Sequence, residues 1–134
     1  MAKFQLQIIT PREIFYDGEA SIITLKISEG YVGIMANRMP LMSSVKISSF
    51  TLREEANGEE KIGIIGNGII KTDKEEVTII VNDVLWVKEA SRTEIDKKLN
   101  KLKDKLSSIK EEGTRKQKVQ DAIDFWELAL KEVK

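Results

Sequence analysis

The 134-residue sequence contains no cysteine and no histidine. The missing cysteines exclude disulfide bonds, and with both residue types absent no Cys/His zinc site can form. The missing histidines remove the commonest general base at neutral pH, and with it any Ser-His-Asp triad. Only carboxylates, amines and hydroxyls remain for chemistry.

The sequence also lacks an excess of either charge and any long apolar run. Lysine plus arginine and aspartate plus glutamate number 22 each, so the formal net charge is zero and a globally basic nucleic-acid binder is disfavoured. No run approaches the ~18 apolar residues that span a bilayer, and polar residues interrupt the start of the chain as no secretory signal does. We expect a soluble protein that reaches a membrane only through a partner.

Residues 1–87 read as short strands separated by turn residues, a pattern typical of a β-sandwich or barrel. Apolar and polar residues alternate at positions 4–8 and 23–27, as they do on strands with one face in water. Turns are predicted at residues 10–11 and at residues 17–18, where proline or glycine interrupts the alternation.

The second half of this region repeats the pattern. Asn57-Gly58 lies between two alternating apolar runs and is the strongest hairpin signal in the chain. A bend at residues 66–68 and a last strand at residues 77–81 follow. The apolar stretch 84–87 is compatible either with an extra strand or with a packing joint between two parts of the chain.

From about Ser91 the apolar period changes from 2 to 3.5, which predicts two helices, each with one narrow apolar seam. A short connection makes the helices an antiparallel hairpin. The predicted fold is therefore α+β: an N-terminal antiparallel β-sandwich (residues 1–87) followed by a C-terminal antiparallel two-helix hairpin (residues 88–134). The seams consist of Ile95, Leu99, Leu102, Leu106 and Ile109, and of Val119, Ile123, Trp126, Leu130 and Val133.

Helix ends are predicted from capping residues. Ser91 with Glu94, and Thr114 with Gln117, fit the capping-box pattern. Gly113 suits the left-handed position that follows a helix.

Two clusters invite a chemical interpretation and have a structural alternative. Residues 66–68 (GNG) suggest a phosphate loop, but a strand-like segment follows where a phosphate loop needs a helix, which favours a simple bend. Glu54, Glu55, Glu59 and Glu60 suggest paired carboxylates, but they flank the Asn57-Gly58 turn, which favours a solvated hairpin tip.

Residues 95–118 carry nine cations against four anions. The segment is interpreted either as a solvated helix face or as a binding surface for an acidic protein or a nucleic acid. Basic surfaces that bind single strands usually interleave aromatic residues, and this segment has none, so an acidic protein partner is preferred to nucleic acid. The basic face comprises Lys97, Lys98, Lys101, Lys105, Arg115 and Lys118.

Five short motifs, in order, resemble those of the epsilon subunits of bacterial F-type ATP synthases. Residues 10–11 (TP) with 16–19 (YDGE) are similar to the family's TP…YSGE, and residues 28–34 (SEGYVGI) to its SEGELGI. Residues 35–42 (MANRMPLM) correspond to LPGHAPLL. Residues 65–70 (IGNGII) are similar to the family's SGGFLEV, and residues 77–83 (VTIIVND) to its VTVLADT.

The resemblance implies a non-catalytic rotor subunit, with no catalytic residue, metal site or cofactor of its own, at the cytoplasmic face of the bacterial cell membrane. It implies a sandwich that docks on the gamma subunit and the c-ring, and couples proton or sodium flow to ATP synthesis. It further implies a mobile hairpin that inhibits ATP hydrolysis by transient contact with the alpha and beta subunits. The first alternative is a stand-alone β-sandwich binding module with a helical oligomerisation hairpin. A small hydrolase that uses carboxylates is the weakest alternative.

The resemblance also implies positions for the contacts. The ring-facing loops would contain Glu29, Tyr31, Arg38 and Met39, with Tyr31 and Arg38 replacing the family's usual Glu and His. Some family members bind ATP through an I/L-D-x-x-R-A motif on the first helix. Ile95 and Asp96 keep only its start, since Leu99 and Asn100 stand at its Arg and Ala, so weak or no ATP binding is expected.

Overall fold

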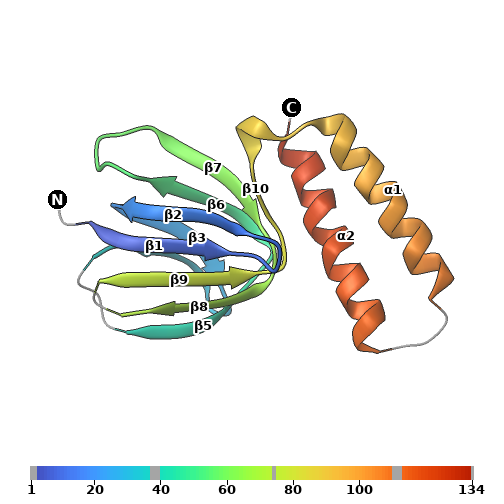
Figure 1. Cartoon of the computed structure of the whole chain (residues 1–134), viewed down its shortest axis with the longest axis horizontal. Coiled ribbons are helices and arrows are strands. Elements are labelled where there is room, and N and C mark those ends of the chain that lie inside the picture. Colours follow the sequence, from blue (N-terminus) through green and yellow to red (C-terminus); the bar gives the residue numbers. More distant parts are fainter. Residues whose placement is uncertain (1–2, 37–39, 74, 110–112, 134) are drawn as a thin grey trace.

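The computed structural model describes residues 3–36, 40–73, 75–109 and 113–133. Strands fill the N-terminal part, and two helices fill the C-terminal part at one end of the sheet (Figure 1). No described helix is long and apolar enough to cross a lipid bilayer. The elements are β1 (Phe4–Ile9), β2 (Ile14–Ala20), β3 (Ile22–Ile27), β4 (Gly30–Ile34), β5 (Leu41–Val45), β6 (Ser48–Arg53), β7 (Glu60–Ile65), β8 (Gly68–Thr72), β9 (Glu76–Val81), β10 (Val84–Trp86), the 3-10 turn η1 (Val87–Glu89), α1 (Arg92–Ser108) and α2 (Thr114–Glu132).

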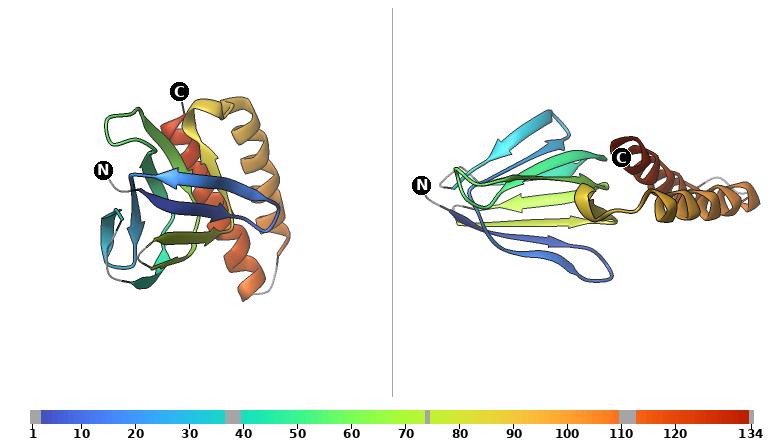
Figure 2. Two further views of the ribbon diagram at one scale, coloured as in Figure 1. Left: turned by 60° about the vertical axis from the view of Figure 1, so that its left-hand side comes forward. Right: turned by 90° about the horizontal axis from the view of Figure 1, so that it is seen from above.

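The strands form one continuous sheet that folds over into the two layers of a sandwich (Figure 2). Its order is β10-β7-β6-β3-β5-β8-β9-β1-β2, with β4 paired to β3. Strand β3 pairs with β6 along Ile22–Thr24 but with β5 only at Ile27, so the sheet changes layer along this strand. The predicted sandwich and helical hairpin are confirmed, with one addition: β1 and β9 pair in parallel. These two strands are far apart in sequence, so no tight turn dictates their relative direction.

The alternation along the strands builds the main core. On β1, Phe4, Leu6 and Ile8 are buried while Gln5 is exposed. The same period-2 pattern directs one face of each strand inward. All buried members of this sandwich core come from strands or strand ends, and none from a helix.

Strand β10 resolves the ambiguous segment 84–87, which is both an extra strand and a packing joint. It pairs with β7 from Val84↔Ile65 to Trp86↔Gly63. Val84 and Trp86 pack on the sandwich core, whereas Leu85 and Val87 pack on the helix cluster. Trp86 contacts the rings of Phe15, Tyr16 and Phe50 at centroid distances of 5.1, 6.4 and 5.4 Å.

Two predictions about turns differ from the structure. The turn predicted at residues 17–18 is wrong, because β2 continues through these residues in register with β1. The reversal lies at residues 10–13, where the Thr10 hydroxyl accepts hydrogen bonds from the N–H groups of Arg12 and Glu13. Strand β5 was not predicted, since its LMSSV sequence gives only a weak alternation. The Asn57-Gly58 hairpin is confirmed, with β6 and β7 paired up to Arg53↔Glu60.

The predicted capping boxes are also wrong. Ser91 is the N-cap of α1, but its side chain makes no capping hydrogen bond. Thr114 is already the first residue of α2, and Gln117 bonds to Asp121 instead of reaching back. Gly113 is the N-cap of α2, with φ +142° and ψ −165°, a backbone conformation that favours glycine. The need for glycine was correctly recognised, but its role was assigned to the wrong helix.

The two seams pack against each other, and α2 carries a second apolar face. Phe125 and Ala129 are buried with Ile64 of β7 in the same cluster as the seam residues Ile95 and Ile123. Figure 1 shows α2 between the sandwich and α1. Apolar contacts therefore cross the boundary near Ser91, and the second face of α2 is covered by the end of the sandwich.

We predict that a fragment of residues 1–88 folds without the helices, because the sandwich core contains no helical side chain. It should melt cooperatively as a β-protein, at a lower temperature than the full chain. The reason is that Ile64 loses its cover, and exposing a buried isoleucine costs about 1.5–3 kcal/mol. Circular dichroism melts of the fragment and the full chain test this. A fragment that stays disordered would show that both clusters form one inseparable folding unit.

Candidate functional site

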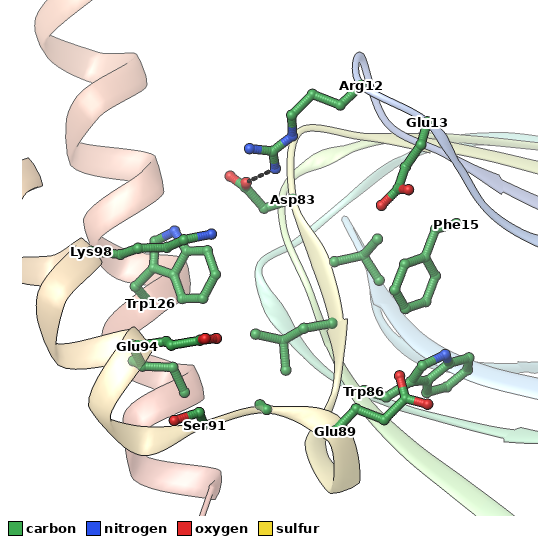
Figure 3. Close-up of a pocket in the computed structure, with 14 residues that line it drawn as sticks. Arg12, Glu13, Phe15, Asp83, Trp86, Glu89, Ser91, Glu94, Lys98 and Trp126 are labelled. Atoms are coloured by element: carbon green, nitrogen blue, oxygen red, sulfur yellow. Dashed lines mark hydrogen bonds and ion pairs between the residues drawn. The ribbon is translucent and has the colours of Figure 1, made fainter.

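A pocket of about 500 Å³ lies between the sandwich and the hairpin (Figure 3). Residues of β10, η1 and the first turns of α1 line it, and Trp126 of α2 closes one side. Phe15 and Trp86 lie on its sandwich side, facing Glu94 and Lys98 of α1. This junction pocket is where the two parts of the chain face each other.

Asp83 is a carboxylate of the junction pocket whose pKa is raised. Burial raises the pKa of the Asp83 carboxyl above its ordinary value of 3.8, while Arg12 and Lys98 lower it by a smaller amount. An Arg12 guanidinium nitrogen lies 3.1 Å from the Asp83 carboxylate. The Lys98 Nζ lies 4.5 Å from the Trp126 ring centroid, a cation–π contact within the hairpin. Among the described residues no group of three or more acidic side chains is placed to hold a metal ion.

We predict that Asp83→Asn raises the melting temperature at neutral pH. The pKa of this carboxyl is raised in the folded state, so the fold binds extra protons between pH 3.8 and that raised value and loses stability as the pH rises through this window. The amide removes this cost, and the lost ion pair involves a well-exposed arginine and contributes little. Thermal melts from pH 3 to pH 7 should show the gain disappearing in acid.

Asp73→Asn is the control of opposite sign. Backbone N–H groups of Glu76 and Glu75 lower the Asp73 pKa, so its charged form is favoured by the fold. This variant should lose stability at neutral pH, and the loss should fade as the pH drops through the carboxyl's folded pKa. If Asp83→Asn melts at a lower temperature than the unchanged chain at pH 7, the prediction for Asp83 is contradicted.

The glutamates of the β6–β7 loop each face a cation rather than one another. Glu54 is paired with Lys61, Glu55 with Lys3, and Glu59 with Lys88 at 2.7 Å. The neighbouring lysines lower the pKa of Glu54 and of Glu59. The interpretation as an exposed hairpin tip is correct, and these carboxylates form no acid–base pair.

The structure divides the predicted basic face. Lys97, Lys101 and Lys105 recur every four residues on the exposed surface of α1 and form no ion pair with a described residue. We call these three the basic stripe. Lys98 lies apart from it, packed on Trp126 at the junction pocket. Arg115 and Lys118 are exposed at the start of α2.

The residues of the shortened ATP motif do not form one site. Ile95 is buried in the helix cluster and Leu99 lies beside it, whereas Asp96 is exposed and does not line the junction pocket. Leu99 fills the seam where the family motif has its arginine. Weak or absent ATP binding stays a prediction.

The proposed ring-facing loops are described only in part. Glu29 lies in the turn between β3 and β4, and Tyr31 follows it with 58% of its surface exposed. Gly30 has φ +119°, which favours glycine in this turn. Arg38 and Met39 lie outside the described residues.

One surface was missed by sequence reasoning. Ile14, Ile9, Ile80 and Ile69 are direct neighbours across β2, β1, β9 and β8. Three of them are 45–57% exposed. We call these four the isoleucine row. Its signal in the sequence is the doubling of isoleucine at residues 8–9, 69–70 and 79–80, because one member of each pair must face outward from its strand.

A groove of about 680 Å³ runs beside the isoleucine row. Ile69 and Ile80 form part of its wall, together with Asn67 of the β7–β8 bend and Asp121 of α2. Exposed apolar side chains that border a groove with polar residues are typical of protein-binding surfaces. The groove extends from the sandwich to the hairpin.

Comparison with known proteins identifies the family. Residues 3–87 match the family described as ATP synthase, Delta/Epsilon chain, beta-sandwich domain. The ATP synthase epsilon chain of Mycoplasmopsis synoviae is 32% identical over 117 residues, covering 87% of this chain and 85% of that protein. The epsilon chain of Clostridium novyi is 33% identical over 108 residues, or 80% of this chain and 82% of that one.

Solved structures show the same fold. A chain in the cryo-EM structure of the Euglena gracilis mitochondrial ATP synthase OSCP/F1/c-ring aligns with a TM-score of 0.67 and 18% identity, over 96% of this chain and 79% of that one. A chain of the Tetrahymena thermophila mitochondrial ATP synthase central stalk and c-ring aligns at 0.59 and 17%, over 96% and 97%. With the sandwich, the hairpin and the matched relatives taken together, the chain belongs to the ATP synthase epsilon family.

Proposed function

We propose that this chain is a non-catalytic rotor subunit in the central stalk of an F-type ATP synthase. It couples proton or sodium flow through the c-ring to ATP synthesis and restrains ATP hydrolysis through its hairpin. The observation that carries the proposal is the epsilon-family sandwich with an exposed isoleucine row on its outer surface. The complex holds the subunit at the cytoplasmic face of the bacterial membrane.

The isoleucine row is the proposed docking surface for the gamma subunit. Side chains of this size stay exposed at a cost in solubility, and docking removes them from water. The groove beside them gives a partner helix or strand a concave seat. The turn with Glu29 and Tyr31, together with Arg38 and Met39, is proposed to face the c-ring.

The alternative of a stand-alone module with an oligomerisation hairpin has less support. An oligomerisation hairpin needs an apolar seam that is left free for a second copy. Here the seams of α1 and α2 cover each other, and the second face of α2 covers the sandwich. The large exposed apolar side chains lie on strands or in strand connections and not on the described parts of the helices.

We predict that Ile69→Asp combined with Ile80→Asp weakens binding to the purified gamma subunit at least tenfold. Two carboxylates in the centre of an apolar contact would lose their hydration without gaining partners. Calorimetric titration with gamma measures the effect. Ile62→Asp is the matched control, since Ile62 is 47% exposed on β7, away from the row. Unchanged affinity of the double variant would contradict the docking assignment.

The basic stripe is the proposed inhibitory surface. While the hairpin lies on the sandwich, Lys97, Lys101 and Lys105 face water. A hairpin that leaves the sandwich and extends along the stalk can bring these cations to an acidic surface of the alpha and beta subunits. Charge pairs at a partly desolvated interface favour one rotor angle over others and so oppose rotation.

We predict that deleting all residues after Glu89 raises the ATP hydrolysis rate of the assembled enzyme and leaves assembly intact. Replacing the three lysines of the basic stripe by glutamine should raise the rate part of the way, and wild-type inhibition should weaken as salt is added. Replacing Lys3, Lys26 and Lys71 of the sandwich by glutamine is the charge-matched control. If the truncated enzyme hydrolyses ATP no faster than the intact one, the hairpin has no inhibitory role.

A further inference from the structure

Four polar side chains join the β7–β8 bend to α2. The Asn67 amide Nδ2 donates to the Asp121 carboxylate Oδ2 at 3.0 Å. The Asn82 amide donates to Asn67 Oδ1 at 3.3 Å, and the Gln117 amide donates to the other Asp121 oxygen at 2.8 Å. We call Asn67, Asn82, Gln117 and Asp121 the clamp. Both ends of its central hydrogen bond are therefore oriented by a second side chain.

The bend that carries Asn67 is held firmly by backbone contacts. The Gly66 N–H donates to the Asp83 carbonyl at 2.7 Å, and the Asn82 N–H donates to the Asn67 carbonyl at 3.2 Å. At Gly68 a side chain would meet the Ile80 carbonyl oxygen at 1.9 Å, so only glycine fits there. Asn67 is thus presented to α2 from a rigid platform.

The clamp is a directional contact of the junction. Among hydrogen bonds between described side chains, the Asn67–Asp121 bond is the one that joins the sandwich to α1 or α2. Apolar side chains such as Ile64, Leu85 and Phe125 pack together beside it. Apolar contacts tolerate sliding, whereas a hydrogen bond to a carboxylate is directional and stronger than a neutral one.

We propose that the Asn67–Asp121 hydrogen bond sets the balance between a hairpin docked on the sandwich and a hairpin released from it. The release of the hairpin and its consequence for catalysis rest on the proposed inhibitory function, whereas the docked state and its hydrogen bond are observed. Breaking the bond leaves a partly buried carboxylate without its partner on the sandwich, which favours release. The docked state then loses the contact that distinguishes it from other positions of α2.

The test uses the full-length isolated chain. Since the sequence has no cysteine, Lys71→Cys and Lys105→Cys introduce one dye pair for single-molecule energy transfer, one dye on the sandwich and one on α1. Asn67→Asp places a second carboxylate against Asp121 and still accepts the bond from Asn82. We expect the released fraction to rise about tenfold, a change of ~1.4 kcal/mol.

Adding Asp121→Asn to Asn67→Asp should restore docking, because the donor and acceptor are then exchanged across the same gap. The matched controls are Asn57→Asp at the β6–β7 loop and Asp124→Asn, whose side chain bonds to Gln120 one turn earlier. Both should leave the balance unchanged. Circular dichroism shows whether each variant keeps its helices and strands. An unchanged released fraction in Asn67→Asp, or no recovery in the double variant, would overturn the proposal.

Hydrolysis assays of the assembled enzyme separate this proposal from the inhibitory function. If release leads to inhibition, Asn67→Asp should lower the ATP hydrolysis rate and the double variant should restore it. If Asn67→Asp releases the hairpin in the isolated chain but leaves hydrolysis unchanged, the proposed role of the clamp in docking is supported and the inhibitory function is contradicted.

Discussion

Val84 and Trp86 pack into the sandwich, while Leu85 and Val87, one residue out of phase, pack against the helices. From Val84 to Trp86 this alternation follows from the two-residue period of a strand, and Val87 continues it at the start of η1. Because β10 is hydrogen-bonded to β7, the same segment orders the edge of the sheet and presents an apolar surface to α2. The aromatic contacts of Trp86 hold the strand in register. The position of the hairpin, the junction pocket and the clamp all depend on this short strand.

Periodicity predicted the elements that depend on burial. The strands with regular alternation and the two helical seams were found because a buried face must repeat with the period of its backbone. The second face of α2 was missed, since Phe125 and Ala129 fall outside a 3.5-residue seam and only the sandwich explains their burial. Strand β5 was missed because its polar serines weaken the pattern, and its pairing with β8 supplies what the local sequence does not.

Turns, caps and the candidate site followed less closely from the sequence. Asp17-Gly18 has turn chemistry, but its pairing with β1 overrides the local preference. The side chains at Ser91 and Thr114 fit capping boxes that the backbone does not form. Pairing with distant segments overrides such local preferences. A helix that begins one residue away from the expected position also loses its predicted cap. The central bond of the clamp joins residues 54 positions apart, so no local pattern indicates it. The sequence correctly predicted a bend at residues 66–68 but not its contact with α2.

The clamp and the isoleucine row share one groove. Asn67, Asn82 and Asp121 line it together with Ile69 and Ile80. A partner segment seated there lies against the polar groups that hold α2, so docking and hairpin position are physically coupled. Such coupling is reciprocal. If a partner binds the released form better than the docked form, breaking the clamp must raise the affinity of the chain for that partner. The size of the coupling is limited by the difference in the partner's affinity for the two forms. If the isoleucine row docks a partner as proposed, the attachment surface lies on paired strands, and the hairpin lies beside that surface rather than within it.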